Sequence, residues 1–186
     1  MSDAVSATFD RRHAEELLSP AGPVSLFFVA DAAQDVGSVP KLRSWAKNGV
    51  AVSLYDGAAA EDLGGISPYL LHLCGDAAMF DWIWSSGWGR SLGVFIWAEQ
   101  SLADLRAHLR RLTKVRTEDG RVLLFRFYDP RVLSVFLPSC DGEQAKYFFG
   151  PAKRFFAERD GGRTLVAYDL RNGSVETETR DLAAAS

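Results

Sequence analysis

Short, uninterrupted apolar runs place the tightest constraint on the fold of this chain. Val24–Val29 and Val50–Leu54 are too short for typical helices and suit strands that are buried on both faces. The segment Ser38–Lys47 between them has apolar residues at helical spacing and starts with a residue that can cap a helix. Strands that are apolar on both faces are typical of parallel sheets joined by helical crossovers. We therefore expect an α/β fold in which the N-terminal strands are parallel through crossovers.

Further strand and helix patterns follow along the chain, and Asp-Gly turns predict hairpins in its C-terminal part. The expected strands are Tyr69–Leu73, Leu92–Trp97, Lys114–Thr117, Arg121–Phe127, Lys153–Glu158 and Thr164–Asp169. The expected helices are Asp10–Leu18, Ala58–Leu63, Ala77–Ser85, Leu102–Leu112, Arg131–Leu137 and Glu143–Phe149. These elements predict a single domain over residues 1–171, with a mixed β-sheet flanked by helices. Residues 172–186 are expected to form a flexible C-terminal tail.

Composition excludes several classes of protein. A chain of 186 residues that is 47% hydrophobic has enough apolar material for one folded domain. Its two cysteines, Cys74 and Cys140, form no disulfide framework and have no metal-ligand spacing, and the three histidines are scattered. No leader-like segment and no apolar run of membrane-spanning length is present. We expect a cytoplasmic protein that binds no metal, cofactor or membrane.

Charge is distributed unevenly along the chain. The net charge is −3, which argues against a general nucleic-acid binder. The segment from Arg106 to Arg131, however, contains eight basic residues and only three acidic ones. Part of this basic charge lies on the outer side of the expected helix Leu102–Leu112. An RNA-binding module on this basic face is therefore one alternative function, although the aromatic phrase of an RNA-recognition motif is absent.

The hexad Arg126-Phe127-Tyr128-Asp129-Pro130-Arg131 gathers polar groups at the expected end of a strand. Asp129 can cap the following helix, and Pro130 loses no hydrogen bond in its first turn, so we assign both a structural role. Strand alternation would place Arg126 and Tyr128 on the face opposite Phe125 and Phe127. A guanidinium and a phenol there, with Arg131 nearby, suit recognition of a peptide carboxylate or backbone. We therefore expect Arg126, Tyr128 and Arg131 to bind a partner.

Tryptophans are concentrated before the strand Leu92–Trp97. Most such side chains belong to a core, but Trp84 falls off the apolar stripe of its helix and Trp88 lies between two glycines. These two are the candidates for exposed contact residues. Arg90, in the same Gly87–Ser91 segment, is assigned to the same partner-binding surface.

A second alternative is a small serine hydrolase, because Gly89-Arg90-Ser91-Leu92-Gly93 matches the pattern of a nucleophile elbow. An elbow joins a strand to a following helix, whereas here a helix precedes Ser91 and a strand follows it. Asp104 and His108 also lie four residues apart on one helix, which is the spacing of a local pair. We therefore expect no catalytic residue and no enzyme activity.

Several phrases of the chain, read in order, resemble a known family over about residues 24–158. They are Leu54–Gly57, Pro68–Leu70, Gly87–Ser91, Leu105–Leu112, Asp119–Arg121, Arg126–Arg131 and Phe149–Pro151. The chain resembles the effector adaptor and chaperone family of bacterial type VI secretion, also called Tap-like or TEC-like. The resemblance implies a non-catalytic protein that binds a cognate type VI effector. It also implies help in loading that effector onto the C-terminal region of the valine–glycine repeat (VgrG) spike protein.

Overall fold

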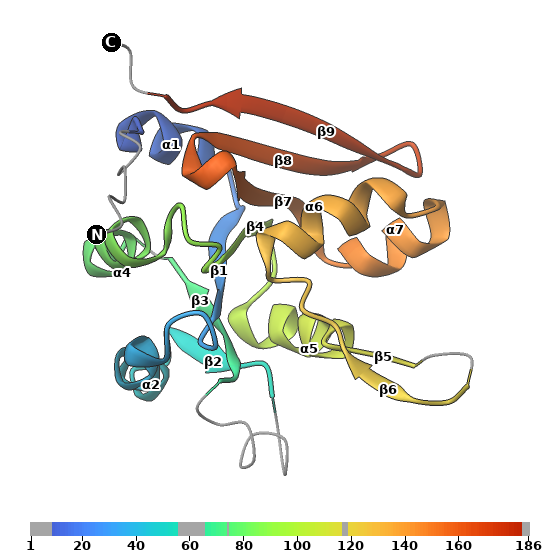
Figure 1. Cartoon of the computed structure of the whole chain (residues 1–186), viewed down its shortest axis with the longest axis horizontal. Coiled ribbons are helices and arrows are strands. Elements are labelled where there is room, and N and C mark those ends of the chain that lie inside the picture. The colour runs from blue at the N-terminus through green and yellow to red at the C-terminus, as the bar shows by residue number, and fades with distance from the viewer. Residues whose placement is uncertain (1–8, 56–65, 74, 117–118, 184–186) are drawn as a thin grey trace, which may run out of the picture.

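A seven-stranded antiparallel sheet organises the molecule, and helices cover both of its faces (Figure 1). The computed structural model describes residues 9–55, 66–73, 75–116 and 119–183. Strands follow the order β2-β3-β1-β4-β7-β8-β9, and β5 pairs with β6 in a separate small sheet. The expected class, a mixed α/β fold with flanking helices, is confirmed. The expected helix Ala58–Leu63 lies outside the described residues.

The predicted parallel pairing of the N-terminal strands is wrong. β1 (Ser25–Asp31) and β2 (Ala51–Ser53) run in the same direction, but β3 (Pro68–His72) lies between them and is antiparallel to both. Leu71 pairs with Phe28 on one side and with Ala51 on the other. The apolar runs indicate burial on both faces, and helices on both faces satisfy that requirement whatever the strand direction.

The other half of the sheet is an antiparallel meander after β4. β4 pairs with both β1 and β7, and the expected hairpin between residues 153 and 169 is present as β7 and β8. The strands of this half are β4 (Gly93–Ala98), β7 (Ala152–Arg159), β8 (Thr164–Arg171) and β9 (Ser174–Asp181). A short 3-10 turn, Asp160–Gly162, joins β7 to β8.

The predicted flexible tail is wrong over most of its length, because β9 pairs along the whole of β8. Asn172 and Gly173 both have positive φ angles, 51° and 79°, which is the geometry of a two-residue hairpin turn. Most residues of β9 are exposed and polar, so no apolar pattern marks this strand. Its stability comes from the ladder with β8 and from cross-strand pairs such as Arg171 with Glu176, at 3.5 Å.

Two cores lie on opposite faces of the sheet, and alternate residues of β1 enter different ones. Phe28 belongs to the first core, whereas Phe27 and Val29 belong to the second. The helices are α1 (Arg11–Leu18), α2 (Val39–Lys47, after the 3-10 turn Val36–Ser38), α4 (Ala77–Trp82, followed by the π-helical turn Ile83–Gly87), α5 (Leu102–Leu112), α6 (Pro130–Ser139) and α7 (Gly142–Phe149). Buried residues of α1, α2 and α4 line the first core, and those of α5, α6 and α7 line the second. None of the described helices is long and apolar enough to cross a bilayer.

A small hairpin stands apart from the sheet beside α5 (Figure 1). Its strands are β5 (Lys114–Arg116) and β6 (Val122–Leu124), and all six residues are exposed. The hairpin was predicted, but β6 ends three residues earlier than expected. The chain then turns toward the sheet, since the amide N–H of Asp129 donates to the carbonyl oxygen of Arg126 at 3.0 Å.

Candidate functional site

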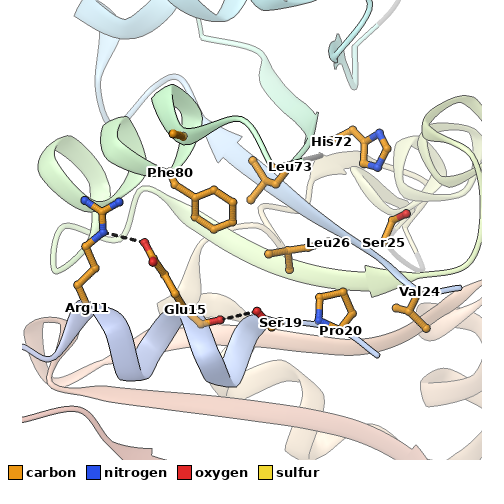
Figure 2. A pocket seen from close by; sticks show the side chains of 12 residues that line it. Arg11, Glu15, Ser19, Pro20, Val24, Ser25, Leu26, His72, Leu73 and Phe80 are labelled. Atoms are coloured by element: carbon orange, nitrogen blue, oxygen red, sulfur yellow. Dashed lines mark hydrogen bonds and ion pairs between the residues drawn. The ribbon is translucent and has the colours of Figure 1, made fainter. Parts of the chain in front are cut away.

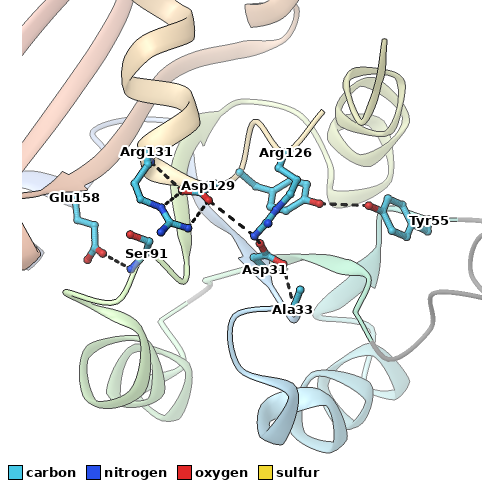
Figure 3. A network of polar contacts seen from close by, with 9 residues as sticks. Asp31, Ala33, Tyr55, Ser91, Arg126, Asp129, Arg131 and Glu158 are labelled. Atoms are coloured by element: carbon cyan, nitrogen blue, oxygen red, sulfur yellow. Dashed lines mark hydrogen bonds and ion pairs between the residues drawn. The ribbon is translucent and has the colours of Figure 1, made fainter. Parts of the chain in front are cut away.

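The hexad lies between the end of β6, the end of β1 and the start of α6 (Figure 3). Asp129 is the N-cap of α6: its Oδ1 accepts from the backbone N–H of Arg131 at 3.0 Å. Pro130 occupies the first turn, where its missing N–H has no helical partner to lose. The structure thus places Asp129 and Pro130 where the sequence predicted a helix cap.

Two carboxylates hold the two arginines of the hexad. The Arg131 guanidinium donates to both oxygens of Asp129, at 2.9 and 2.7 Å. Arg126 donates to Asp31, which is buried at the end of β1, and lies 3.8 Å from Asp129. With its side-chain amide oriented to suit both guanidinium groups, Gln34 accepts from Arg126 at 2.8 Å and from Arg131 at 3.1 Å. The network joins β1 to the start of α6.

Burial and pairing set the ionisation of this network. Burial alone would raise the pKa of Asp129, but the hydrogen bonds from Arg131 outweigh it and hold that pKa below its usual value. Burial would likewise lower the pKa of Arg126, and its hydrogen bond to Asp31 reverses that effect and raises it. Asp129 and the two guanidinium groups are therefore charged near neutral pH, because pairing also raises the pKa of Arg131.

Tyr128 does not lie on an exposed strand face, contrary to the prediction. Because β6 ends at Leu124 and the chain turns, Phe127 and Tyr128 both enter the second core. The Tyr128 hydroxyl lies 3.3 Å from the hydroxyl of Tyr55, which is also buried. Burial raises the pKa of Tyr128 well above its usual value. Tyr128 therefore belongs to the interior.

The two tryptophans predicted as exposed anchors pack in the first core. Trp84 is only 7% exposed, and its indole N–H donates to Glu15 at 2.7 Å. Trp88 is half-buried, makes a T-shaped contact with Trp84 at 4.9 Å, and donates to the carbonyl oxygen of Gly162 at 2.8 Å. The predicted exposure is therefore wrong for Trp84, whereas Trp88 keeps part of its surface in contact with solvent; each indole N–H finds a partner far away in the sequence. Arg90 is exposed and lines a small cavity with Gln34 and Asp35.

Ser91 lies between the π-helical turn and β4, as its sequence context predicted. It has the positive φ of a strained turn, 57°, and its backbone N–H donates to the buried Glu158, as does that of Gly89. The Nε2 atom of His108 lies 2.8 Å from the carbonyl oxygen of Phe148. The Asp104 carboxylate accepts from the hydroxyl of Ser101 at 2.6 Å. Ser91, Asp104 and His108 therefore have separate partners and form no triad.

A groove of about 600 Å³ lies between α1, the start of β1 and α4 (Figure 2). Leu26, Leu73 and Phe80 supply apolar walls, and Arg11 pairs with Glu15 at 2.7 Å beside them. The sequence did not predict this groove, because its walls come from segments far apart in the chain. Its apolar walls suit an uncharged side chain better than a charged ligand. Within the described residues, no group of three His, Cys, Asp or Glu side chains could hold a metal ion.

The hairpin of β5 and β6 exposes apolar side chains that sequence analysis did not single out. Val122 is 56% exposed and Leu124 is 51% exposed, and Val115 and Leu123 are also exposed. The signal was present in the run Val122–Leu124: consecutive residues of a strand point to opposite faces, so a ribbon packed on one face cannot bury all three. This surface, defined by Val115, Val122, Leu123 and Leu124, is called the hairpin patch below.

A family model described as a domain of unknown function (DUF4123) matches residues 26–147. The matched range runs from β1 into α7, covers more than half of the chain, and contains both the hexad and the hairpin patch. No curated protein and no solved structure matches the chain.

Proposed function

Because the chain belongs to the DUF4123 family, which is associated with type VI secretion effector adaptors, we propose that it is a non-catalytic effector adaptor and chaperone. It binds a cognate type VI effector in the cytoplasm, before secretion. It then helps load that effector onto the C-terminal region of the VgrG spike protein. The family match over residues 26–147 is the observation that carries this proposal.

Two features of the structure support an adaptor. The charged groups of the hexad that could suggest chemistry are paired, Arg131 with Asp129 and Arg126 with Asp31. The hairpin patch, in contrast, exposes four aliphatic side chains on one short ribbon, and exposed apolar surface of this kind marks interaction sites. An adaptor needs a rigid body and an exposed contact surface, and these two regions supply them.

Of the residues predicted to bind a partner, the arginines remain available on the surface. The Arg131 side chain is 65% exposed while it pairs with Asp129, and Arg90 and Arg126 also reach solvent. We propose that these three arginines border the contact surface. Tyr128 and Trp84 would support it from the interior.

Co-expression tests the proposed function directly. The chain is produced with the protein encoded by a neighbouring effector gene, and separately with the C-terminal region of the VgrG spike, and each mixture is resolved by size-exclusion chromatography. We expect a stable complex with the effector and a weaker or effector-dependent one with the spike. If the chain elutes alone from both mixtures, the adaptor proposal fails.

The hydrolase alternative is tested with the purified chain and a set of short-chain esters. We expect no turnover above background, and we expect Ser91→Ala to change stability by less than about 0.5 kcal/mol, as for an ordinary surface substitution. Turnover that Ser91→Ala abolishes would contradict the adaptor proposal.

A further inference from the structure

The backbone of β6 directs hydrogen-bonding groups away from β5 at two positions. The amide N–H of Phe125 donates to the carbonyl oxygen of Thr113 at 2.9 Å, and the register pairs Leu123 with Val115. Hydrogen-bonded and non-hydrogen-bonded pairs alternate along an antiparallel ladder. Leu123 therefore bonds inward to β5, while the N–H and C=O groups of Val122 and Leu124 point outward. Among the described residues, no third strand pairs with β6.

The side chains around this edge are apolar on both faces of the ribbon. Val122 and Leu124 lie on one face, and Val115 and Leu123 lie on the other. A two-stranded ribbon is marginally stable in water by itself, and a third strand with apolar side chains would cover the exposed surface. Unpaired strand edges of this kind are templates for an added strand.

One face of the ribbon is also basic, through residues of β5. Lys114 is opposite Leu124 and Arg116 is opposite Val122. Both cationic side chains therefore lie on the same face of the ribbon as the side chains of Val122 and Leu124. Arg110 and Arg111, in the last turn of α5, extend the basic surface next to β5. The chain as a whole carries a net charge of −3, so this positive charge is local. A partner that matches it is acidic.

We propose that β6 is the docking strand for the effector, and that an extended effector segment with alternating apolar and acidic side chains adds to its outer edge. The inference rests on the proposed adaptor function and names the element that makes the contact. Backbone bonds to Val122 and Leu124 would set the register, and carboxylates would pair with Lys114 and Arg116. RNA fits this edge less well, because aliphatic side chains dominate it and the described hairpin has no aromatic side chain for base stacking.

Two variants and one matched control test the docking strand against the neighbouring effector. Val122→Pro removes an outward N–H but keeps the inward bonds of Leu123, and proline is tolerated at the first residue of an edge strand. Lys114→Glu combined with Arg116→Glu reverses the charge without changing the backbone. Arg12→Glu on α1 is the control, because its side chain is 91% exposed and α1 packs on the first core, on the face of the sheet opposite the one that α5 covers. Affinities are measured by biolayer interferometry, and folding is checked by thermal melts.

We expect each hairpin variant to weaken effector binding by about tenfold or more, with an unchanged melting temperature, while Arg12→Glu binds as the wild type does. Hydrogen exchange of the wild-type complex should show new protection at the amides of Val122 and Leu124. If the wild type binds the effector and the hairpin variants bind equally well, the docking strand is wrong and the adaptor function stands. If the wild type binds no effector, both proposals fail. Binding of a 20-nucleotide RNA that the charge reversal abolishes, without effector binding, would overturn the docking strand in favour of RNA.

Discussion

The hexad and the hairpin are neighbours in sequence, yet they use their side chains in opposite ways. In residues 126–131, the two guanidinium groups pair with Asp129 and with Asp31 of β1, and the aromatic side chains are buried. In residues 114–124, aliphatic side chains are exposed, and the backbone N–H and C=O groups of two residues of β6 point away from β5. The charged groups of the hexad find partners within the fold, whereas the aliphatic side chains of the hairpin are left on the surface. A conspicuous polar motif can thus be structural, while the plain aliphatic run beside it is the part that stays exposed.

Removal of an aromatic ring from the hexad is expected to have the largest effect. Phe127 is fully buried in the second core, so Phe127→Ala should lower the free energy of unfolding by about 3–5 kcal/mol. Leu124→Ala, in the exposed hairpin, should change it by less than about 0.5 kcal/mol. Urea unfolding followed by tryptophan fluorescence measures both. Similar losses in the two variants would remove the contrast between the regions.

The helix cap should have a smaller effect. Asp129→Ala removes the acceptor for the Arg131 amide and the carboxylate for its guanidinium, and should cost about 1–2 kcal/mol. Asp129→Asn keeps a capping oxygen but not the charge, so it should cost less. Thermal melts and effector-binding isotherms are recorded side by side for both variants. If the hexad is structural, stability falls while affinity is retained; a selective loss of affinity would instead make the hexad part of the interface.

The dependence of stability on pH sharpens the comparison further, with the smallest effect. Pairing lowers the pKa of Asp129 in the folded state. Asp129 therefore contributes to the free energy of unfolding above its unfolded-state pKa of about 3.9, and this contribution is lost as pH falls through the folded-state pKa. Burial, only partly offset by the amides of Gly89 and Ser91, raises the pKa of Glu158. The contribution of Glu158 to the free energy of unfolding is therefore complete below its unfolded-state pKa of about 4.3, and it is lost as pH rises through the folded-state pKa.

Melting temperatures of four proteins across acidic and neutral pH separate the two carboxylates. Relative to the wild type, Asp129→Asn should lose less stability on acidification. Glu158→Gln should lose less stability than the wild type as pH rises from below about 4.3 toward neutral. The hairpin double variant at Lys114 and Arg116 is the comparison, and its profile should follow the wild type. Identical profiles for all four proteins would show that neither carboxylate is coupled to folding.

Elements with local signals were predicted well. The helix Leu102–Leu112 has the predicted bounds, and Ser101 caps it by accepting from the amide of Asp104 at 3.2 Å. The cap at Asp129 and the hairpin before it follow equally local rules, namely capping chemistry and the Asp-Gly turn. Such signals depend on residues a few positions apart, so a single sequence contains them.

Features that depend on distant residues were not predicted. The pairing of β1 and β2 depends on the insertion of β3, and the burial of Trp84 depends on Glu15, which lies 69 residues earlier in the chain. The burial of Tyr128 follows from the early end of β6, a boundary that periodicity places poorly. The strand β9 is a different case, because the Asn172-Gly173 turn was a local signal that its polar sequence concealed.

The two kinds of exposed strand edge also bear on how the protein behaves in the cell. β9 closes one edge of the large sheet with alternating charged residues, including Glu176, Glu178 and Arg180, and charged edges resist pairing with other chains. β6 consists of Val122, Leu123 and Leu124 and therefore has no charged residue. Association between copies of the chain at high concentration would therefore start at this hairpin and not at β9, and a segment that occupied β6 as proposed would suppress it.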